Sequence, residues 1–101
     1  MTLSELTKTR PQDYSNREMA AAYCFTDYLL HEQKEKLGEF LKSAYKEFVA
    51  RYQEKKAPET AVELMNRLLE TLEMSEEQFM DAFRLWALAN YFELNAAEES
   101  K

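Results

Sequence analysis

The scarcity of turn-forming residues constrains the fold of this chain more than any other feature. Its 101 residues contain one glycine and two prolines. Two-residue β-hairpins depend on glycine or asparagine at positive φ, so a sheet of hairpins would lack the residues that its turns need. Apolar residues recur instead at the helical period. The sequence therefore predicts an all-α fold, and its length suits a single domain over residues 1–101 with one core.

The segment 75–94 is expected to be the central helix. Ser75 and Gln78 have the spacing of a capping box, which marks a helix start. One face is apolar along its whole length: Phe79, Met80, Phe83, Trp86, Ala87, Tyr91 and Leu94. The opposite face carries three more apolar residues: Leu85, Leu88 and Phe92. A helix that is apolar nearly all round is typical of the middle of a structure.

Four main helices are predicted in all. Their expected ranges are 16–32, 36–54, 59–72 and 75–94. Ser15 and Glu18 form a second capping box, and Pro58 is typical of a first helical turn. Short connections make consecutive helices antiparallel, so we expect a compact array of four. A short helical turn at residues 3–6 precedes them, and residues 95–101 are expected to be a polar tail that frays.

The first two of these helices differ in how their apolar residues are distributed. On helix 16–32 we expect one main face to pack against the core: Met19, Ala22, Tyr23, Thr26, Leu29 and Leu30. Its other side carries a second apolar set: Ala21, Phe25 and Tyr28. On helix 36–54 a single face is expected to pack, and on one side only: Leu37, Phe40, Leu41, Ala44, Tyr45, Phe48, Val49 and Tyr52.

The charge of the chain is unevenly distributed. The net charge is −6, and residues 1–58 contain 10 Lys/Arg and 9 Asp/Glu, whereas residues 59–101 contain 3 and 10. The acidic half would repel a phosphate backbone, so nucleic-acid binding through it is disfavoured. A basic partner, in contrast, would be steered toward it.

No set of residues points to catalysis, a metal or a cofactor. His31 and Glu35 are spaced to share a helix face, but a zinc site needs three or four protein ligands. The single cysteine, Cys24, lies in an apolar helical segment, where a thiol is usually an inert core residue. We therefore expect no enzyme activity, no catalytic residue, no metal and no cofactor. With neither a signal-peptide pattern nor a membrane span, a cytoplasmic protein without membrane contact is expected.

A helix-turn-helix regulator that binds nucleic acid is the first alternative function. Helix 59–72, a short turn and helix 75–94 have the outline of that motif. However, the recognition helix would begin with Glu76 and Glu77, which place carboxylates where phosphates and base edges would lie.

The second apolar faces are the main functional signal. Either those of helices 16–32 and 75–94 meet inside the monomer, or they stay exposed and bind a partner. The candidate apolar residues for binding are Leu85, Leu88, Phe92, Phe25 and Tyr28. The candidate acidic residues that would steer a partner are Glu70, Glu73, Glu77 and Asp81. We predict a small protein-binding module, a regulator or inhibitor of the acidic kind found in phages and mobile elements. Its partner would be another protein, or a second copy in a homodimer.

Four segments also carry a resemblance to a known family. The segments are 3–6, 20–30, 36–41 and 72–79, in that order along the chain. Together they resemble the helical tail that follows the catalytic core of peptidase-MA-like zinc metallopeptidases. Phe83 stands where that tail often has tryptophan, and the HExxH zinc motif is absent. The resemblance implies a non-catalytic helical region and, as a second alternative function, an accessory segment of a larger hydrolase.

Overall fold

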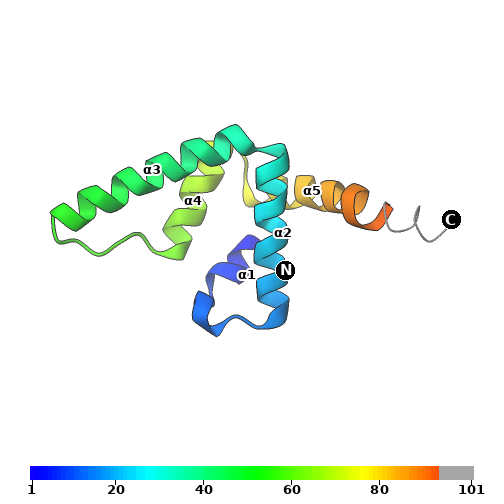
Figure 1. Ribbon diagram of the computed structural model, residues 1–101, viewed down its shortest axis with the longest axis horizontal. Helices are drawn as coiled ribbons and strands as arrows, with labels where there is room; N and C mark the ends of the chain where they lie inside the picture. Colours follow the sequence, from blue (N-terminus) through cyan, green and yellow to red (C-terminus); the bar gives the residue numbers. More distant parts are fainter. Residues whose placement is uncertain (94–101) are drawn as a thin grey trace.

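The computed structural model describes residues 1–93, and their regular structure is entirely helical (Figure 1). The segments are α1 (Leu3–Thr7), the 3-10 turn η1 (Pro11–Asp13), α2 (Asn16–Glu32), α3 (Lys34–Gln53), α4 (Ala61–Leu72), α5 (Glu76–Ala87) and the π-helical segment η2 (Leu88–Glu93). The prediction of an all-α fold with four main helices and a short N-terminal turn is confirmed. Leu94 and the predicted tail, 95–101, lie outside the described residues.

Side-chain caps determine where the helices begin. The Ser75 hydroxyl accepts from the backbone N–H of Gln78 at 3.1 Å, and the Gln78 side chain accepts from the Ser75 N–H at 2.9 Å. This capping box was predicted and is confirmed. Helix α4 begins later than predicted, because Thr60 caps it by accepting from the Glu63 N–H at 3.2 Å, and Pro58 stays in the preceding loop.

The core lies where α2 crosses α5. Phe79 of α5 is the one described side chain that is completely buried, at 0% exposure. The rings of Phe25 and Tyr28, from α2, pack edge-on against Phe79 with centroids 5.9 and 5.5 Å away. Edge-on aromatic pairs add stabilisation beyond the apolar area that they bury. Leucines from α1 and α4 complete the core: Leu3, Leu68 and Leu72.

The face of α2 that packs on the core is largely opposite to the predicted one. Phe25 and Tyr28, assigned to the second face, are buried, whereas Met19, Tyr23 and Leu30 of the expected main face are more than half exposed. The spacing shows which residues share a face, but it does not show which of two apolar faces meets the aromatic residues of α5.

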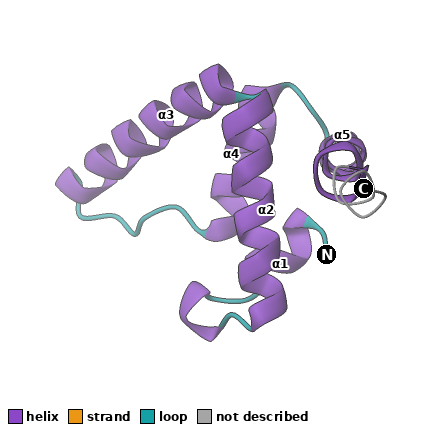
Figure 2. Cartoon of the chain, turned by 45° about the vertical axis from the view of Figure 1, so that its right-hand side comes forward, coloured by secondary structure: helices purple, strands orange, loops and turns teal. Residues whose placement is uncertain are grey.

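The helices spread away from this core in two directions. Figures 1 and 2 show α3 on one side of α2 and α5 on the other side. The molecule measures 59 × 29 × 21 Å along its principal axes, and α3 and α5 extend away from α2 in opposite directions along the longest one (Figure 1). Surfaces on α3 and on the outer end of α5 are therefore too far apart to cover each other within one chain.

The short helix α1 is tied to the start of α5 by one carboxylate. Glu76 accepts from the Ser4 backbone N–H at 2.8 Å and from the Ser4 hydroxyl at 2.6 Å. The hydroxyl, and to a lesser extent the N–H, lower the pKa of Glu76 from its ordinary value of 4.5. The folded state therefore favours the ionised carboxylate.

This lowered pKa makes one part of the stability dependent on pH. The stabilisation from ionised Glu76 is fully present above its unfolded-state pKa, and it is lost as the pH falls through the lower, folded-state pKa. We expect Glu76→Gln to lower the free energy of unfolding at neutral pH by about 1 kcal/mol, because two hydrogen bonds to a partly solvated charge are weakened. Urea unfolding across the acidic range should show the difference from wild type shrinking as the pH falls. The exposed neighbour Glu77 provides the control, and a loss in Glu77→Gln as large as in Glu76→Gln would contradict this assignment.

Candidate protein-binding surfaces

Helix α3 contains no buried side chain, although it is the longest helix of the structure. Four large residues lie on one line along it, at intervals of four, three and four positions, and we call them the α3 stripe: Leu41, Tyr45, Phe48 and Tyr52. Their exposures are 56%, 70%, 53% and 77%. The prediction that this whole apolar face packs against the core is wrong for these four residues. Only the inner part of the face, with Leu37 and Phe40, reaches the core.

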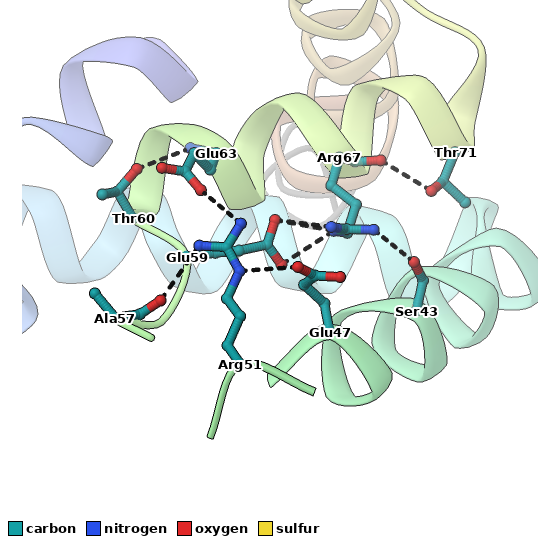
Figure 3. A network of polar contacts seen from close by, with 9 residues as sticks. All are labelled: Ser43, Glu47, Arg51, Ala57, Glu59, Thr60, Glu63, Arg67 and Thr71. Carbon is teal, nitrogen blue, oxygen red and sulfur yellow. Dashed lines mark hydrogen bonds and ion pairs between the residues drawn. The ribbon is translucent and has the colours of Figure 1, made fainter. Parts of the chain in front are cut away.

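Beyond the apolar contacts of Leu37 and Phe40 with the core, a network of polar contacts holds α3 to α4 (Figure 3). The guanidinium of Arg67 donates to both carboxylate oxygens of Glu59, at 2.9 to 3.1 Å, and to the Ser43 hydroxyl at 2.8 Å. The Glu59 side chain is only 7% exposed, so its charge depends on this partner. Hydrogen bonding to Glu59 raises the pKa of Arg67 above its ordinary value, so the guanidinium stays protonated.

A second arginine continues this network toward the end of α3. Arg51 donates to Glu47 at 2.8 Å and to the Ala57 carbonyl oxygen at 3.3 Å, and it lies 3.5 Å from Glu63 (Figure 3). Its hydrogen bond lowers the pKa of Glu47. The network closes the loop between α3 and α4 and leaves the α3 stripe uncovered beside α4.

The surface beside the stripe is hollowed. An open hollow of about 340 Å³ has mostly apolar walls: Leu41, Ala44, Tyr45, Phe48, Pro58, Glu59 and Leu64. A second hollow, of about 210 Å³, is walled by α1, α3 and α4, and Leu64 belongs to both. Ligand and peptide sites are typically apolar concavities with a few polar groups, and this part of the chain has that character.

The stripe has a positively charged border on the side away from α4. Lys42 and Lys46 are exposed one turn apart, and neither forms an ion pair within the described part of the chain. The acidic residues Glu47 and Glu59 on the other side are each bound to an arginine. We call Lys42 and Lys46 the lysine border.

On α5 the structure separates the predicted binding residues. Leu85 and Leu88 are 71% and 52% exposed, and the side chain of Phe92 is not among those described. Phe25 and Tyr28 are only 4% and 3% exposed, so they belong to the core and not to a binding surface. The second faces of α2 and α5 therefore do not meet each other. The main face of α5, with Phe83 and Trp86, already covers the second face of α2.

The predicted acidic residues are all exposed, at two places. Glu77, Asp81 and Leu85 lie on one face of α5, and Leu88 continues this line at the start of η2. These four residues form what we call the α5 patch. Asp81 lies 3.6 Å from Arg84. Glu70 lies in the last turn of α4, and Glu73 ends that helix with a left-handed φ of 57°.

Sequence reasoning missed the α3 stripe, although two signals were present. Eight apolar residues on one helix cover a wider arc than one packing contact needs. Three of the four stripe residues are aromatic, two of them tyrosines, which suit a surface that is buried only on binding.

The other sequence candidates form no reactive site among the described residues. His31 Nδ1 lies 3.1 Å from a carboxylate oxygen of Asp27, on its own helix, instead of pairing with Glu35. The Tyr91 hydroxyl also donates a hydrogen bond to Asp27. The pKa of Tyr91 is raised, mainly by burial and to a lesser extent by this hydrogen bond. Within residues 1–93 no three His, Cys, Asp or Glu side chains gather as metal ligands would, and no described helix combines the length and apolar character needed to cross a membrane.

The start of α5, which would be the recognition helix of a helix-turn-helix, is acidic in the structure. Glu76, at the start of the would-be recognition helix, accepts both hydrogen bonds from Ser4, and Glu77 beside it is exposed. The leading turn of α5 therefore presents carboxylate to any approaching backbone phosphate.

Comparisons with known proteins add no information to this geometry. No family model, no curated protein and no solved structure matches the chain. The features of the molecule that bear on a function are the α3 stripe, the hollows beside it and the α5 patch.

Proposed function

We propose that this protein is a small helical module that binds another protein through the α3 stripe, without catalysis of its own. In this role it would act as a regulator or inhibitor of its partner. One observation carries the proposal: Leu41, Tyr45, Phe48 and Tyr52 are each more than half exposed along one line of a helix. Contiguous apolar surface of this kind is typical of an interface.

The size of the stripe supports binding but limits its strength. On the scale of roughly 150 to 250 Å² per aromatic side chain, the three aromatic residues alone expose about 400 Å². Burying that area gives roughly 10 kcal/mol at about 25 cal/mol per Å². Association itself costs on the order of 4 to 15 kcal/mol, so the stripe alone supports only weak binding. A tight complex would also use the hollows and the lysine border.

The spacing of the stripe favours a helical partner. Intervals of four, three and four residues are those of a coiled-coil seam, in which side chains from two helices interlock. An amphipathic helix laid along α3 would insert its own apolar residues beside Leu64 and Pro58, which line the larger hollow. The expectation of a cytoplasmic protein remains part of this proposal, on the basis of the single cysteine.

Site-specific photocrosslinking in the native host tests the proposal. A benzoylphenylalanine residue is placed at Phe48 in one variant and, as the control, at Ala50, which is exposed on the opposite side of α3. We expect a discrete crosslinked product from position 48 and none from position 50. Equal products from both positions, or none from either, would contradict the proposal. If the product contains a hydrolase domain, the alternative of an accessory segment, and with it the metallopeptidase resemblance, gains support.

A further inference from the structure

The chain carries two uncovered apolar surfaces that differ in charge. The α3 stripe has the lysine border, and residues 34–53 contain five basic and three acidic residues. The α5 patch combines Leu85 and Leu88 with Glu77 and Asp81, and residues 70–87 contain five acidic residues and one arginine. One surface is therefore apolar with a positive border, and the other is apolar with a negative one.

This difference determines which contact between two copies is favoured. If two α3 stripes met, Lys42 and Lys46 of one copy would approach those of the other, and like charges at a contact are unfavourable. If two α5 patches met, Glu77 and Asp81 would repel in the same way. When a stripe meets a patch, the lysines face carboxylates and the apolar residues of both surfaces are buried together.

Other charges near the stripe do not oppose this pairing. Glu59, which lines the hollow, and its neighbour Glu47 are bound by Arg67 and Arg51 at 2.8 to 3.1 Å. Glu39, one turn before Lys42, lies 3.8 Å from Lys36. On the patch, only Asp81 has an arginine nearby, at the longer distance of 3.6 Å. Both lysines, and at least Glu77 on the other side, are therefore available for a partner.

We propose that the α3 stripe of one copy receives the α5 patch of a second copy, so that the protein associates head to tail. Leu85 and Leu88 lie against Tyr45 and Phe48, and Glu77 and Asp81 face the lysine border. This proposal rests on the proposed function, because it uses the same stripe and names a second copy as an occupant.

The position of the two surfaces determines the form of the assembly. The stripe and the patch lie on opposite sides of α2, and α3 and α5 extend away from each other along the 59 Å axis, so neither surface reaches the other within one chain (Figure 1). When the stripe of one copy binds the patch of another, the pair still has one free patch and one free stripe. Further copies can bind to these two free surfaces. Association therefore continues with rising concentration and does not stop at a dimer, unless a ring closes. A separate partner bound to the stripe would end the chain of copies.

Sedimentation velocity of two single variants and their mixture tests this arrangement. Phe48→Asp places a charge in the stripe, and Leu85→Asp places one in the patch. We expect the mean mass of wild type to rise between micromolar and millimolar concentration, less so in high salt, and both variants to stay monomeric. Mixed in equal amounts, the variants should form a pair with twice the 12.0 kDa of one chain and nothing larger, because each supplies the surface that the other lacks.

Several results would overturn the head-to-tail contact. A wild type that stays monomeric would do so, as would a Leu85→Asp variant that still associates, because the contact would then join two stripes. A mixture that stays monomeric although both variants keep the wild-type circular dichroism and melting temperature would also overturn it. If either aspartate variant unfolds, charge reversal replaces it: Lys42→Glu with Lys46→Glu, and Glu77→Lys with Asp81→Lys. Each reversed pair should weaken association at least tenfold, and all four changes in one chain should restore it. A failure to restore it would overturn the contact.

Failure of the head-to-tail contact and failure of the proposed function can be told apart by the crosslinking experiment. A monomeric wild type whose position 48 crosslinks to a different protein contradicts head-to-tail association and leaves the proposed function standing. A monomeric wild type without any position-specific crosslink contradicts both.

Discussion

Replacing Phe79 by alanine is expected to lower the free energy of unfolding by about 3–5 kcal/mol, the usual cost of removing a buried phenylalanine ring. Phe79 has no exposed surface, and the rings of Phe25 and Tyr28 both pack against it. The cavity would open between α2 and α5, where the ring of Phe79 now fills the space, and the structure could collapse into it only by moving one helix toward the other. Since domains of this size have about 5–15 kcal/mol of stability in total, much of the variant should be unfolded in mild urea.

Phe48→Ala is the matched control for this prediction. The same ring is removed, but Phe48 is 53% exposed on the α3 stripe. We expect a loss of no more than about 1 kcal/mol in urea unfolding at low protein concentration. A loss as large as that of Phe79→Ala would mean that the stripe is packed inside the monomer, which would contradict the proposed binding surface.

The second large effect is expected from Arg67→Met, which keeps the aliphatic part of the side chain and removes the charge. Glu59, 7% exposed, would lose its partner, and Ser43 would lose a donor. Leaving a buried acceptor unsatisfied costs about 1–3 kcal/mol. Because this network holds α3 to α4, hydrogen exchange of the α3 amides should also rise, while exchange in α2 stays near the wild-type rate.

Arg51→Met provides the comparison for Arg67→Met. Arg51 also binds a glutamate of α3, but this partner, Glu47, is 37% exposed. Without Arg51 its carboxylate would be hydrogen-bonded by water. The loss of stability should therefore be clearly smaller. Equal losses in urea unfolding would show that burial of Glu59 does not determine the strength of the network.

The sequence predicted the helices well because their signals are local. The reciprocal hydrogen bonds of Ser75 and Gln78 involve residues three positions apart, and helical spacing needs no knowledge of distant residues. The start of α4 was less well predicted, because Pro58 and Thr60 are both plausible starts and only the capping hydrogen bond distinguishes them.

Which faces of α2 and α3 pack against the core depended on contacts between distant residues, and those two predictions were wrong. Two apolar faces of α2 competed for the core, and the one with Phe25 and Tyr28 packed against Phe79. On α3, the pairing of Arg67 with Glu59 and Ser43 fixed which side of the helix faces α4. The spacing of apolar residues within one helix shows neither of these contacts. It therefore could not distinguish the exposed residues of the α3 stripe from the residues of α3 that reach the core.

The candidate site was predicted in part for the same reason. Leu85 and Leu88 were recognised because the main face of their helix was already complete without them. Phe25 and Tyr28 looked equivalent in the sequence, but the aromatic rings of α5 cover them. Exposure is a property of the whole packing arrangement, and a pattern within one helix does not determine it.

The central claim is that the α3 stripe is uncovered in a single chain, and hydroxyl-radical footprinting tests it most directly. Tyr45 and Tyr52 of the stripe are compared, in dilute protein, with Tyr23, which is 69% exposed, and with Tyr28, which is 3% exposed. We predict that Tyr45 and Tyr52 are oxidised as fast as Tyr23, while Tyr28 is protected. Protection of Tyr45 and Tyr52 to the level of Tyr28, at a concentration where the protein is monomeric, would contradict the claim.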